Sequence, residues 1–225
     1  MIPAAGRGTR LGPITDEKPK PLVEIGQRSL IEHLIDDLRV IGIDQIQVVV
    51  GYMRDMIEDR LNSYENVSFI EQEKQLGTAH AIGLSSFKEP FMVVNGDVFI
   101  HRQNLIKLKD SFEESTAGAV MGSKAVQNPE EFGVLDVDGK EVEGLVEKPE
   151  DPQTNLINTG VYAFRPRIYD YIDMTDRSER GEYEITDSLN MMRDGGHRVI
   201  HAPMEKYWID VGRPEDLERA RNISG

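Results

Sequence analysis

A glycine-rich, basic loop lies at the start of the chain. Residues 4–13 read Ala-Ala-Gly-Arg-Gly-Thr-Arg-Leu-Gly-Pro, and residues 18–21 read Lys-Pro-Lys-Pro. Because glycine lacks a Cβ atom, such a backbone can turn tightly and bring its N–H groups against an anion. The arginines and lysines of these two stretches add positive charge to the same place. The combination favours a polyanion such as a triphosphate, although glycine and proline also occur together in simple turns.

The loop matches neither of two common phosphate-binding motifs. The G-x-x-x-x-G-K-[ST] pattern of the P-loop is absent from it. Gly6 and Gly8 fit the start of the dinucleotide motif G-x-G-x-x-G, but Leu11 occupies the third glycine position and Gly12 comes one residue late. A dinucleotide-binding oxidoreductase is therefore disfavoured.

Two aspartates have positions suited to a metal site. Residues 95–97 read Asn-Gly-Asp and directly follow the apolar run Phe91–Val94. A carboxylate at a strand end, here that of Asp97, is a good ligand for Mg²⁺. Asp210 stands between two apolar neighbours, where burial without a partner is costly. Both have simpler explanations as well, because Asn-Gly and Gly-Asp are frequent turn pairs and Asp210 could cap the following helix.

Two further polar segments follow apolar runs. Residues 72–78 read Gln-Glu-Lys-Gln-Leu-Gly-Thr, in which the amide of Gln72 suits the edge of a pyrimidine base and Gly77 lets the backbone approach it. Residues 147–149 read Glu-Lys-Pro, in which the glutamate can accept hydrogen bonds from sugar hydroxyls and the lysine can pair with a phosphate. The structural alternatives are a loop with Thr78 as a helix cap, and an exposed ion pair before a proline.

The first half of the chain alternates strands with helices. Ser29 followed by Glu32 is a capping-box pattern, and apolar residues then recur at helical spacing up to Ile41, before Gly42 ends the helix. Strands are expected at 46–50, 67–70 and 91–94, and helices at 54–61, 78–86 and 103–114. This alternation predicts a parallel sheet that is covered by helices on both faces.

The pattern changes after Thr116. Strands are expected at 119–121, 133–137, 142–146, 158–164 and 208–211, with a hairpin turn at Asp138-Gly139. Helices are expected at 185–193 and from Pro214 onward. The second half is therefore predicted to be mixed. Because ligands bind beyond the carboxyl ends of parallel strands, the segments expected to form the site are 6–20, 71–78, 95–99 and 147–150.

Composition excludes several classes of partner. The 225 residues are enough for one substantial domain, and no apolar run is long enough to span a bilayer. A net charge of -14 argues against nucleic acid and anionic membrane as partners, because both are bound through basic surfaces. The absence of cysteine excludes disulfides and thiolate metal sites, so any metal must have oxygen or histidine ligands. A cytoplasmic location is expected, and the sequence is compatible with a homo-oligomer.

Taken together, these segments resemble the sugar-1-phosphate nucleotidyltransferases, also called NDP-sugar pyrophosphorylases. The resemblance extends over essentially the whole chain and is closest to the glucose-1-phosphate uridylyl- and thymidylyltransferases. The matching stretches, in order, are residues 4–11 with 18–22, 72–81, 96–97, 131–134, 147–149, 158–162 and 208–217. No single stretch is decisive, and it is their joint order that carries the resemblance.

The resemblance implies a role for individual residues. The implied nucleotide ligands are Ala4, Ala5, Gly6, Gly8, Thr9, Arg10, Lys20, Gln72, Gly77, Thr78 and Gly96. The implied sugar-phosphate ligands are Gly133, Glu147, Lys148, Asn158 and Gly160. Arg10, Lys20 and Lys148 are the implied catalytic residues, and Asp97 and Asp210 are implied to share one Mg²⁺.

The implied fold is α/β, a Rossmann-like α/β/α sandwich with a mostly parallel central sheet and a smaller mixed-β sugar-binding insertion. It would form a single domain over 1–225, with a nucleotide-binding half at 1–116 and a sugar-binding half with closing helices at 117–225. Family members usually have several residues ahead of the glycine-rich loop. Here only three precede it, so the first strand is short or begins upstream. The chain ends after the closing helix, so the C-terminal β-helix acyltransferase region of many relatives is expected to be absent.

The implied reaction joins an NTP to a sugar 1-phosphate and releases pyrophosphate. UTP or dTTP and glucose 1-phosphate are the favoured substrates. A mannose- or heptose-1-phosphate guanylyltransferase is the main alternative enzyme. A non-catalytic subunit that senses nucleotides or sugar phosphates is a further alternative. Loss of Arg10, Asp97, Lys148 or Asp210 would mark such a subunit, and all four are present.

Overall fold

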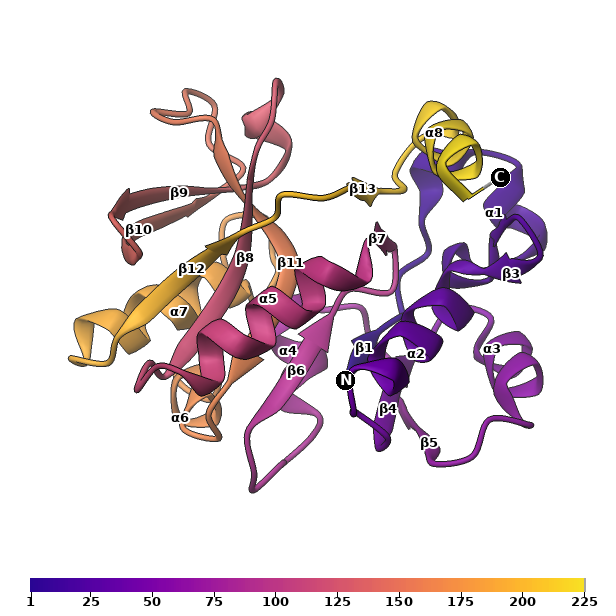
Figure 1. Cartoon of the computed structure of the whole chain (residues 1–225), viewed down its shortest axis with the longest axis horizontal. Helices are drawn as coiled ribbons and strands as arrows, with labels where there is room; N and C mark the ends of the chain where they lie inside the picture. The colour runs from indigo at the N-terminus through magenta and orange to yellow at the C-terminus, as the bar shows by residue number, and fades with distance from the viewer. Residues whose placement is uncertain (225) are drawn as a thin grey trace. The chain divides into compact units, whose positions relative to one another are not determined.

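The chain divides into two compact units in the structure, a computed structural model that describes residues 1–224 (Figure 1). The first unit comprises Met1–Gln75, Val94–Leu105 and Lys206–Gly225. The second comprises Leu76–Val93 and Ile106–Glu205. Each unit is therefore assembled from separate stretches of the chain. The expected division into a nucleotide-binding half at 1–116 and a sugar-binding half at 117–225 refers to bound ligands, so it stays a prediction.

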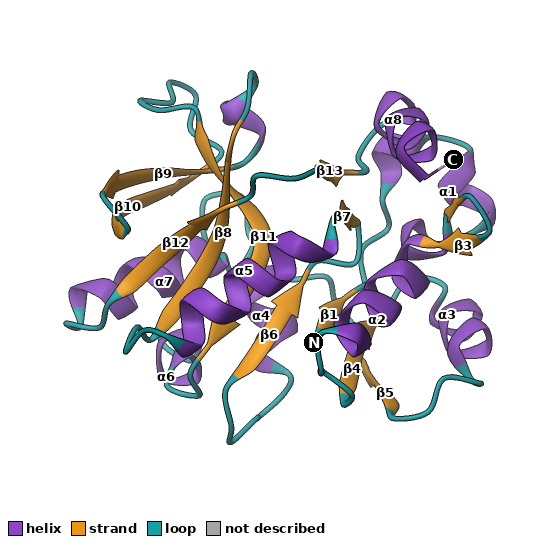
Figure 2. Ribbon diagram, in the orientation of Figure 1, coloured by secondary structure: helices purple, strands orange, loops and turns teal. Residues whose placement is uncertain are grey.

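A three-stranded parallel sheet is the centre of the first unit (Figure 2). Its strands, in spatial order, are β1 (Ile2–Pro3), β4 (Ile46–Val50) and β5 (Val67–Glu71). The helices α2 (Leu30–Val40) and α3 (Arg54–Leu61) follow in the alternating order that the sequence predicts. Val48, Val49 and Val50 are fully buried, as expected of a parallel strand that is covered on both faces.

Shorter elements complete the first unit. They are the 3₁₀ turns η1 (Thr9–Leu11) and η2 (Lys20–Leu22), the helices α1 (Ile14–Glu17) and α8 (Pro214–Ser224), and two antiparallel pairs. One pair joins β2 (Glu24–Ile25) to β3 (Arg28–Ser29), and the other joins β7 (Val98–Ile100) to β13 (Trp208–Asp210). The second pair brings the last strand of the chain against a segment more than a hundred residues earlier, and it forms part of the candidate site.

A six-stranded mixed sheet is the centre of the second unit. Its order is β6-β11-β8-β12-β10-β9, in which β8 and β12 are parallel, whereas the β11–β8, β10–β12 and β10–β9 pairs are antiparallel. The strands are β6 (Phe91–Val94), β8 (Ala119–Ala125), β9 (Gly133–Asp138), β10 (Glu141–Glu147), β11 (Leu156–Phe164) and β12 (Val199–Pro203). The helices are α4 (Thr78–Gly83), α5 (Arg102–Glu113), α6 (Ile168–Ile172) and α7 (Ile185–Asp194), with the 3₁₀ turn η3 at Pro129–Glu131. Strand β6 and helix α5 pass from one unit to the other.

The predicted elements with strong local patterns are confirmed, and the errors lie where local signals are weak. The helix predicted at 78–86 ends at Gly83. The sequence analysis did not predict β7, β12, α1 or α6. Strand β7 follows β6 after only three residues and takes its partner from the far end of the chain, so no local pattern marks it. Within residues 1–224, no helix has both the length and the apolar character needed to cross a membrane.

The capping box of α2 is confirmed and is linked to α3. The Glu32 carboxylate accepts hydrogen bonds from Ser29 N at 2.8 Å and Ser29 Oγ at 2.7 Å. Arg60 Nη2 lies 2.9 Å from the same oxygen. Burial alone would raise the pKa of Glu32, but Arg60 and the two Ser29 hydrogen bonds outweigh it and lower the pKa to about 2. The charged form of Glu32 therefore stabilises the fold.

Glu32→Gln is expected to destabilise the first unit in a pH-dependent way. Because the folded-state pKa is depressed, the contribution of Glu32 is present above about pH 4.5 and is lost as the pH falls toward 2. The expected loss in the free energy of unfolding at pH 7 is on the order of 3 kcal/mol. Urea unfolding at a series of pH values measures it, with the exposed Glu89→Gln as the control. A loss that does not shrink below pH 4 would contradict the ionic origin.

Candidate active site

The two predicted metal ligands are brought together by the β7–β13 pair in the first unit. Asp210 lies opposite Val98 in the antiparallel register, one residue from Asp97. Val211 N also donates a hydrogen bond of 2.9 Å to the Asp97 carbonyl oxygen. The pairing of these strands therefore holds the two aspartates side by side, although 113 residue positions separate them in the sequence.

An apolar cluster anchors this pair from the opposite face. Its buried members are Leu11, Val23, Ile25, Leu30, Phe99, Ile209, Val211, Leu217 and Ala220. Ile209 and Val211 flank Asp210 in the sequence, so strand alternation directs them to the face opposite its carboxylate. The same cluster includes Leu11 of the glycine-rich loop and Leu217 of α8. The strand that carries Asp210 and the glycine-rich loop therefore pack against the same apolar cluster.

Lys20 lies between the two carboxylates. Its Nζ is 2.9 Å from Asp97 Oδ2 and 3.4 Å from Asp210 Oδ1. Only 6% of Lys20 is exposed, so its ammonium group is removed from bulk water. Since both oxygens lie within hydrogen-bonding distance of one nitrogen, the three groups form a single charged cluster. The family resemblance implies a phosphate contact for Lys20, and no local sequence pattern predicts its contact with the aspartates.

The charges of the cluster are strongly coupled. Burial would raise the pKa of Asp97, but the charge and hydrogen bond of Lys20 hold it below its usual value. Burial and the charge of Asp97 together raise the pKa of Asp210 to about 6, against the opposing effects of Lys20 and Arg10. Burial would lower the pKa of Lys20, but the two aspartates raise it. Lys20 and Arg10 together therefore oppose the effect of burial on the two carboxylates, and at Asp210 they do not cancel it.

The donor set fits a magnesium ion that also binds a substrate. Mg²⁺ prefers oxygen ligands and is commonly held by one or two carboxylates together with substrate phosphates. No group of three or more histidine, aspartate or glutamate side chains suited to a metal occurs within 1–224. The Asp97–Asp210 pair supplies two carboxylates of this kind where β7 and β13 pair. Two carboxylates leave the other coordination positions of such an ion to water and to substrate phosphates.

The glycine-rich loop is fitted closely around Lys20. Gly8 has φ +65°, and a Cβ atom added to it would lie 2.9 Å from Lys20 Cβ. The buried side chain of Thr15 donates its Oγ1 hydrogen to the carbonyl oxygens of Gly8 and Gly12, each at 3.1 Å. Gln75 Nε2 donates to the Ala5 carbonyl at 2.8 Å. Backbone geometry and two side chains that the sequence analysis did not select therefore shape this loop.

The predicted nucleotide residues of the first unit lie along strand ends. Ala4 and Ala5 are buried, and Ala4 N donates to the Val49 carbonyl at 2.8 Å. Gly96 N donates to the Pro3 carbonyl at 2.8 Å, and a Cβ atom on Gly96 would lie 2.8 Å from that same oxygen. Only glycine therefore permits this approach of β1 to the segment after β6.

Other predicted nucleotide residues differ in exposure. The Arg10 side chain is 53% exposed, and its Nη2 lies 3.7 Å from Asp210 Oδ2. Thr9 is the first residue of the η1 turn, and a Cβ atom added to Gly6 would have no atom within 4 Å. Gln72 is buried, and its backbone N donates to the Val50 carbonyl at 2.8 Å. Arg10 is therefore the accessible cation at the edge of the cluster.

Two of the predicted nucleotide residues belong to the second unit. Gly77 has φ +105°, and a Cβ atom there would lie 2.5 Å from the Tyr183 carbonyl oxygen. Thr78 is the first residue of α4, with Gly77 in the N-cap position, so Thr78 does not cap this helix as the alternative explanation proposed. The next backbone N, that of Ala79, donates to the Tyr183 carbonyl at 3.0 Å.

Three predicted sugar-phosphate residues converge in the second unit. Gly133 pairs with Glu147 across the β9–β10 ladder. A Cβ atom on Gly133 would lie 3.0 Å from Glu147 Oε2 and 3.6 Å from Asn158 Cβ. Thr186 Oγ1 lies 3.4 Å from Glu147 Oε2, and Arg180 Nη1 lies 3.4 Å from Glu147 Oε1. Burial raises the pKa of Glu147, against the charges of Lys148 and Arg180.

Asn158 and Gly160 mark an irregularity in β11. The pairing of β11 with β8 shifts between Asn158 and Tyr162, and Gly160 within this shift has φ +71°. Asn158 Nδ2 donates to Tyr162 Oη at 2.5 Å, and Gly160 N donates to Asn158 Oδ1 at 3.1 Å. Both ends of the Asn158 amide are therefore fixed. The sequence analysis did not select Tyr162, Thr186 or Arg180, whose roles depend on non-local packing.

Lys148 has a strained backbone. Its φ is +44°, which is uncommon for a residue other than glycine, and its N donates to the Phe132 carbonyl at 3.0 Å. Such strain clusters at ligand-binding positions. The structure thus groups several of the predicted residues in each unit: the Lys20 cluster in the first, and the Glu147 group (Gly133, Glu147 and Asn158) in the second. Gly77 of the second unit instead approaches Tyr183.

Known proteins match this chain over nearly all of its length. It is 34% identical over 232 residues to the low-salt glycan biosynthesis nucleotidyltransferase Agl11 of Haloferax volcanii, covering 99% of this chain and 65% of that protein. It is 38% identical over 224 residues to a bifunctional sugar-1-phosphate nucleotidylyltransferase/acetyltransferase of Sulfurisphaera tokodaii, covering 96% of this chain and 53% of that protein. The chain therefore spans only about half to two thirds of these relatives.

A solved structure supports the fold. A UDP-glucose pyrophosphorylase complexed with UDP-glucose superposes with a TM-score of 0.85 at 26% identity, covering 99% of this chain and 96% of the other. The predicted α/β fold, that of the nucleotide-diphospho-sugar transferases, is thereby confirmed. The family model described as nucleotidyl transferase matches residues 1–224. This chain is a member of the nucleotidyl transferase family.

Proposed function

We propose that the chain is a sugar-1-phosphate nucleotidyltransferase, which joins an NTP to a sugar 1-phosphate and releases pyrophosphate. The observation that carries the proposal is the Lys20–Asp97–Asp210 cluster beside the glycine-rich loop. Family membership supports the same reaction class, as does the similarity to the bifunctional sugar-1-phosphate nucleotidylyltransferase/acetyltransferase of Sulfurisphaera tokodaii.

The residues of the first unit would bind and orient the triphosphate. Backbone N–H groups of the loop can approach phosphates because glycine leaves room for them. Arg10, half exposed at the edge of the cluster, would pair with phosphate oxygens as a planar fork. Asp97 and Asp210 would hold Mg²⁺, which supplies charge neutralisation at the phosphates. Lys20 would keep the two carboxylates in place and add positive charge next to the triphosphate.

The residues of the second unit would hold the nucleophile. Glu147 and Asn158 present oxygen and amide groups suited to sugar hydroxyls, and Lys148 would pair with the sugar phosphate. The phosphate oxygen then attacks the α-phosphorus in line as the bond to pyrophosphate breaks. The reaction needs no covalent enzyme intermediate, so positioning and charge neutralisation supply the catalysis.

We further propose UTP or dTTP as the nucleotide and glucose 1-phosphate as the sugar phosphate. Residues 72–78 resemble the base-reading segment of uridylyl- and thymidylyltransferases. The UDP-glucose pyrophosphorylase that shares the fold supports this choice, since its structure contains UDP-glucose. A non-catalytic sensing subunit is disfavoured, because the chain retains the four charged residues that such a subunit would lose.

The purified chain is expected to release pyrophosphate from UTP or dTTP when glucose 1-phosphate and Mg²⁺ are present. A coupled pyrophosphate assay should compare the four common NTPs, each with glucose 1-phosphate and with mannose 1-phosphate. Turnover confined to GTP and mannose 1-phosphate would replace the proposed substrates while keeping the reaction class. Tight NTP binding without turnover under any condition would overturn the enzyme proposal.

Asp97→Asn is expected to reduce the rate of pyrophosphate release by about a hundredfold or more while the fold is retained. The substitution keeps the side-chain size and removes the charge that pairs with Lys20 and would bind Mg²⁺. Circular dichroism should show an unchanged spectrum, and Asp44→Asn, at an exposed position of the same unit, is the matched control. A variant that turns over at the rate of the control would remove Asp97 from the mechanism.

Gly8→Ala is expected to lower kcat/KM at least tenfold, because the added Cβ would displace Lys20. Gly139→Ala is the matched control, since Gly139 has a similar φ of +59° and nothing within 4 Å of an added Cβ. Both variants should lose on the order of 1 kcal/mol of stability from the positive φ. Equal activities in the two variants would show that the position of Lys20 does not limit the reaction.

A further inference from the structure

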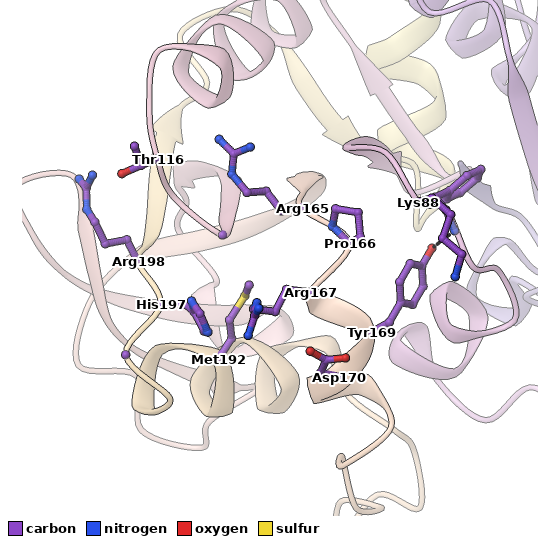
Figure 3. Close-up of a pocket in the computed structure, with 13 residues that line it drawn as sticks. Lys88, Thr116, Arg165, Pro166, Arg167, Tyr169, Asp170, Met192, His197 and Arg198 are labelled. Atoms are coloured by element: carbon purple, nitrogen blue, oxygen red, sulfur yellow. Dashed lines mark hydrogen bonds between the residues drawn. The ribbon is translucent and has the colours of Figure 1, made fainter.

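A cavity of about 710 Å³ lies within the second unit, apart from the Glu147 group (Figure 3). It is bounded by the residues just before β8, just after β11 and just before β12. Its volume is within the usual range of about 300–1,000 Å³ for small-molecule sites. The cavity is therefore large enough for a metabolite of ordinary size.

The cavity and the Glu147 group lie at opposite ends of β11. Asn158 is near the start of this strand, whereas Arg165 follows its last residue, Phe164. A strand rises about 3.3 Å per residue, so about 20 Å separate Asn158 from the cavity. A ligand in the cavity would therefore not overlap a sugar phosphate bound by Glu147 and Asn158.

The lining of the cavity is basic, in contrast to the rest of the chain. The chain has 40 acidic and 26 basic residues. Among the described residues that line the cavity, four are lysine or arginine, one is a histidine and one, Asp170, is acidic. The basic residues are Lys88, Arg165, Arg167, His197 and Arg198. A concave surface lined by one sign of charge attracts small ions of the opposite sign.

Two of these basic side chains have structural partners. Arg165 donates to the carbonyl oxygens of Ala117 and Ser115, each at 3.0 Å, and its guanidinium lies over the Phe112 ring. Arg198 pairs with the carboxylate of Glu141, with Nε 3.2 Å from Oε1. These contacts explain the presence of both arginines without a ligand.

Lys88 and Arg167 have no such explanation. Neither makes an ion pair with any residue that the structure describes, and both are exposed. Figure 3 shows the side chains of Arg167 and His197 directed toward Met192. The ring of His197 packs with its edge to Tyr171 at a centroid distance of 5.9 Å, which holds it in place. Lys88 and Arg167 therefore lack a carboxylate partner among the described residues, and a bound anion would supply the opposite charge.

The floor of the cavity is closely packed. Met192 is fully buried on α7, and a Cβ atom on Gly118 would lie 2.4 Å from Met192 Cε. Gly118 also links the surrounding segments, since its N donates to the Arg198 carbonyl and its carbonyl accepts from Arg165 N. The loops that carry the basic residues are therefore tied together around a packed apolar base.

We propose that this cavity binds a small phosphate-bearing metabolite, at a site separate from the proposed sugar-phosphate residues. Arg167 supplies a planar fork that matches a phosphate group, and Lys88 adds a flexible point charge. The apolar floor at Met192 and the ring of Tyr169 would pack against the organic part of the ligand. The proposal does not depend on the proposed function, because binding alone tests it.

Calorimetric titration of the full chain with inorganic phosphate, AMP and glucose 6-phosphate tests the proposal. Binding is expected to be at least tenfold weaker in Arg167→Gln combined with Lys88→Gln. Lys140→Gln, an exposed site in the same unit, controls for the loss of charge. Lys148→Gln removes the proposed sugar-phosphate contact and should leave binding at the cavity unchanged. Thermal unfolding of each variant shows that the fold is retained.

The measurements distinguish binding in the cavity from binding at the proposed sugar-phosphate residues. Loss of binding in the Arg167 and Lys88 variant but not in Lys148→Gln supports the proposal. An ester that binds more tightly than inorganic phosphate, and whose binding is lost in the Arg167 and Lys88 variant, identifies the ester class. Loss of binding confined to Lys148→Gln would overturn the proposal. It would also be overturned if none of the three probes bound the wild-type chain at a concentration of about 10 mM, which would detect dissociation constants in the millimolar range.

Discussion

The candidate site depends on one buried ammonium group held between two carboxylates. Lys20 contacts both Asp97 and Asp210 and is almost fully buried. Removing three charges from water is costly, and their mutual attraction offsets that cost only when the geometry is maintained. Burial and the charge of Asp97 raise the pKa of Asp210 to about 6, although Lys20 and the nearby Arg10 oppose this shift.

The rest of the first unit serves to maintain that geometry. The β7–β13 pair places the aspartates side by side, and the apolar cluster beneath it includes Leu11 of the loop and Leu217 of α8. Gly8 allows Lys20 to reach the aspartates, and Thr15 fixes the loop through two carbonyl oxygens. Local backbone shape, strand pairing and core packing therefore converge on the same few side chains.

Features with local causes could be predicted from the sequence. The α2 helix follows from its capping box, and the buried strand β4 follows from a run of β-branched residues. The association of Asp97 with Asp210 came from family resemblance alone. The position of Lys20 between them could not be predicted, because it depends on the pairing of β7 with a strand from the end of the chain. The contacts of Glu147 with Thr186 and Arg180 could not be predicted either, because these residues lie more than thirty positions away in the sequence and meet only in the folded chain.

The central claim is that Lys20, Asp97 and Asp210 form one mutually compensating cluster, and a mutant cycle on the free energy of unfolding tests it directly. Lys20→Met alone should cost about 2 kcal/mol or more, because it leaves two carboxylates without their buried partner. Adding Asp97→Asn and Asp210→Asn to Lys20→Met should recover most of that loss, giving a large coupling energy. Losses that simply add across the three substitutions would contradict the claim.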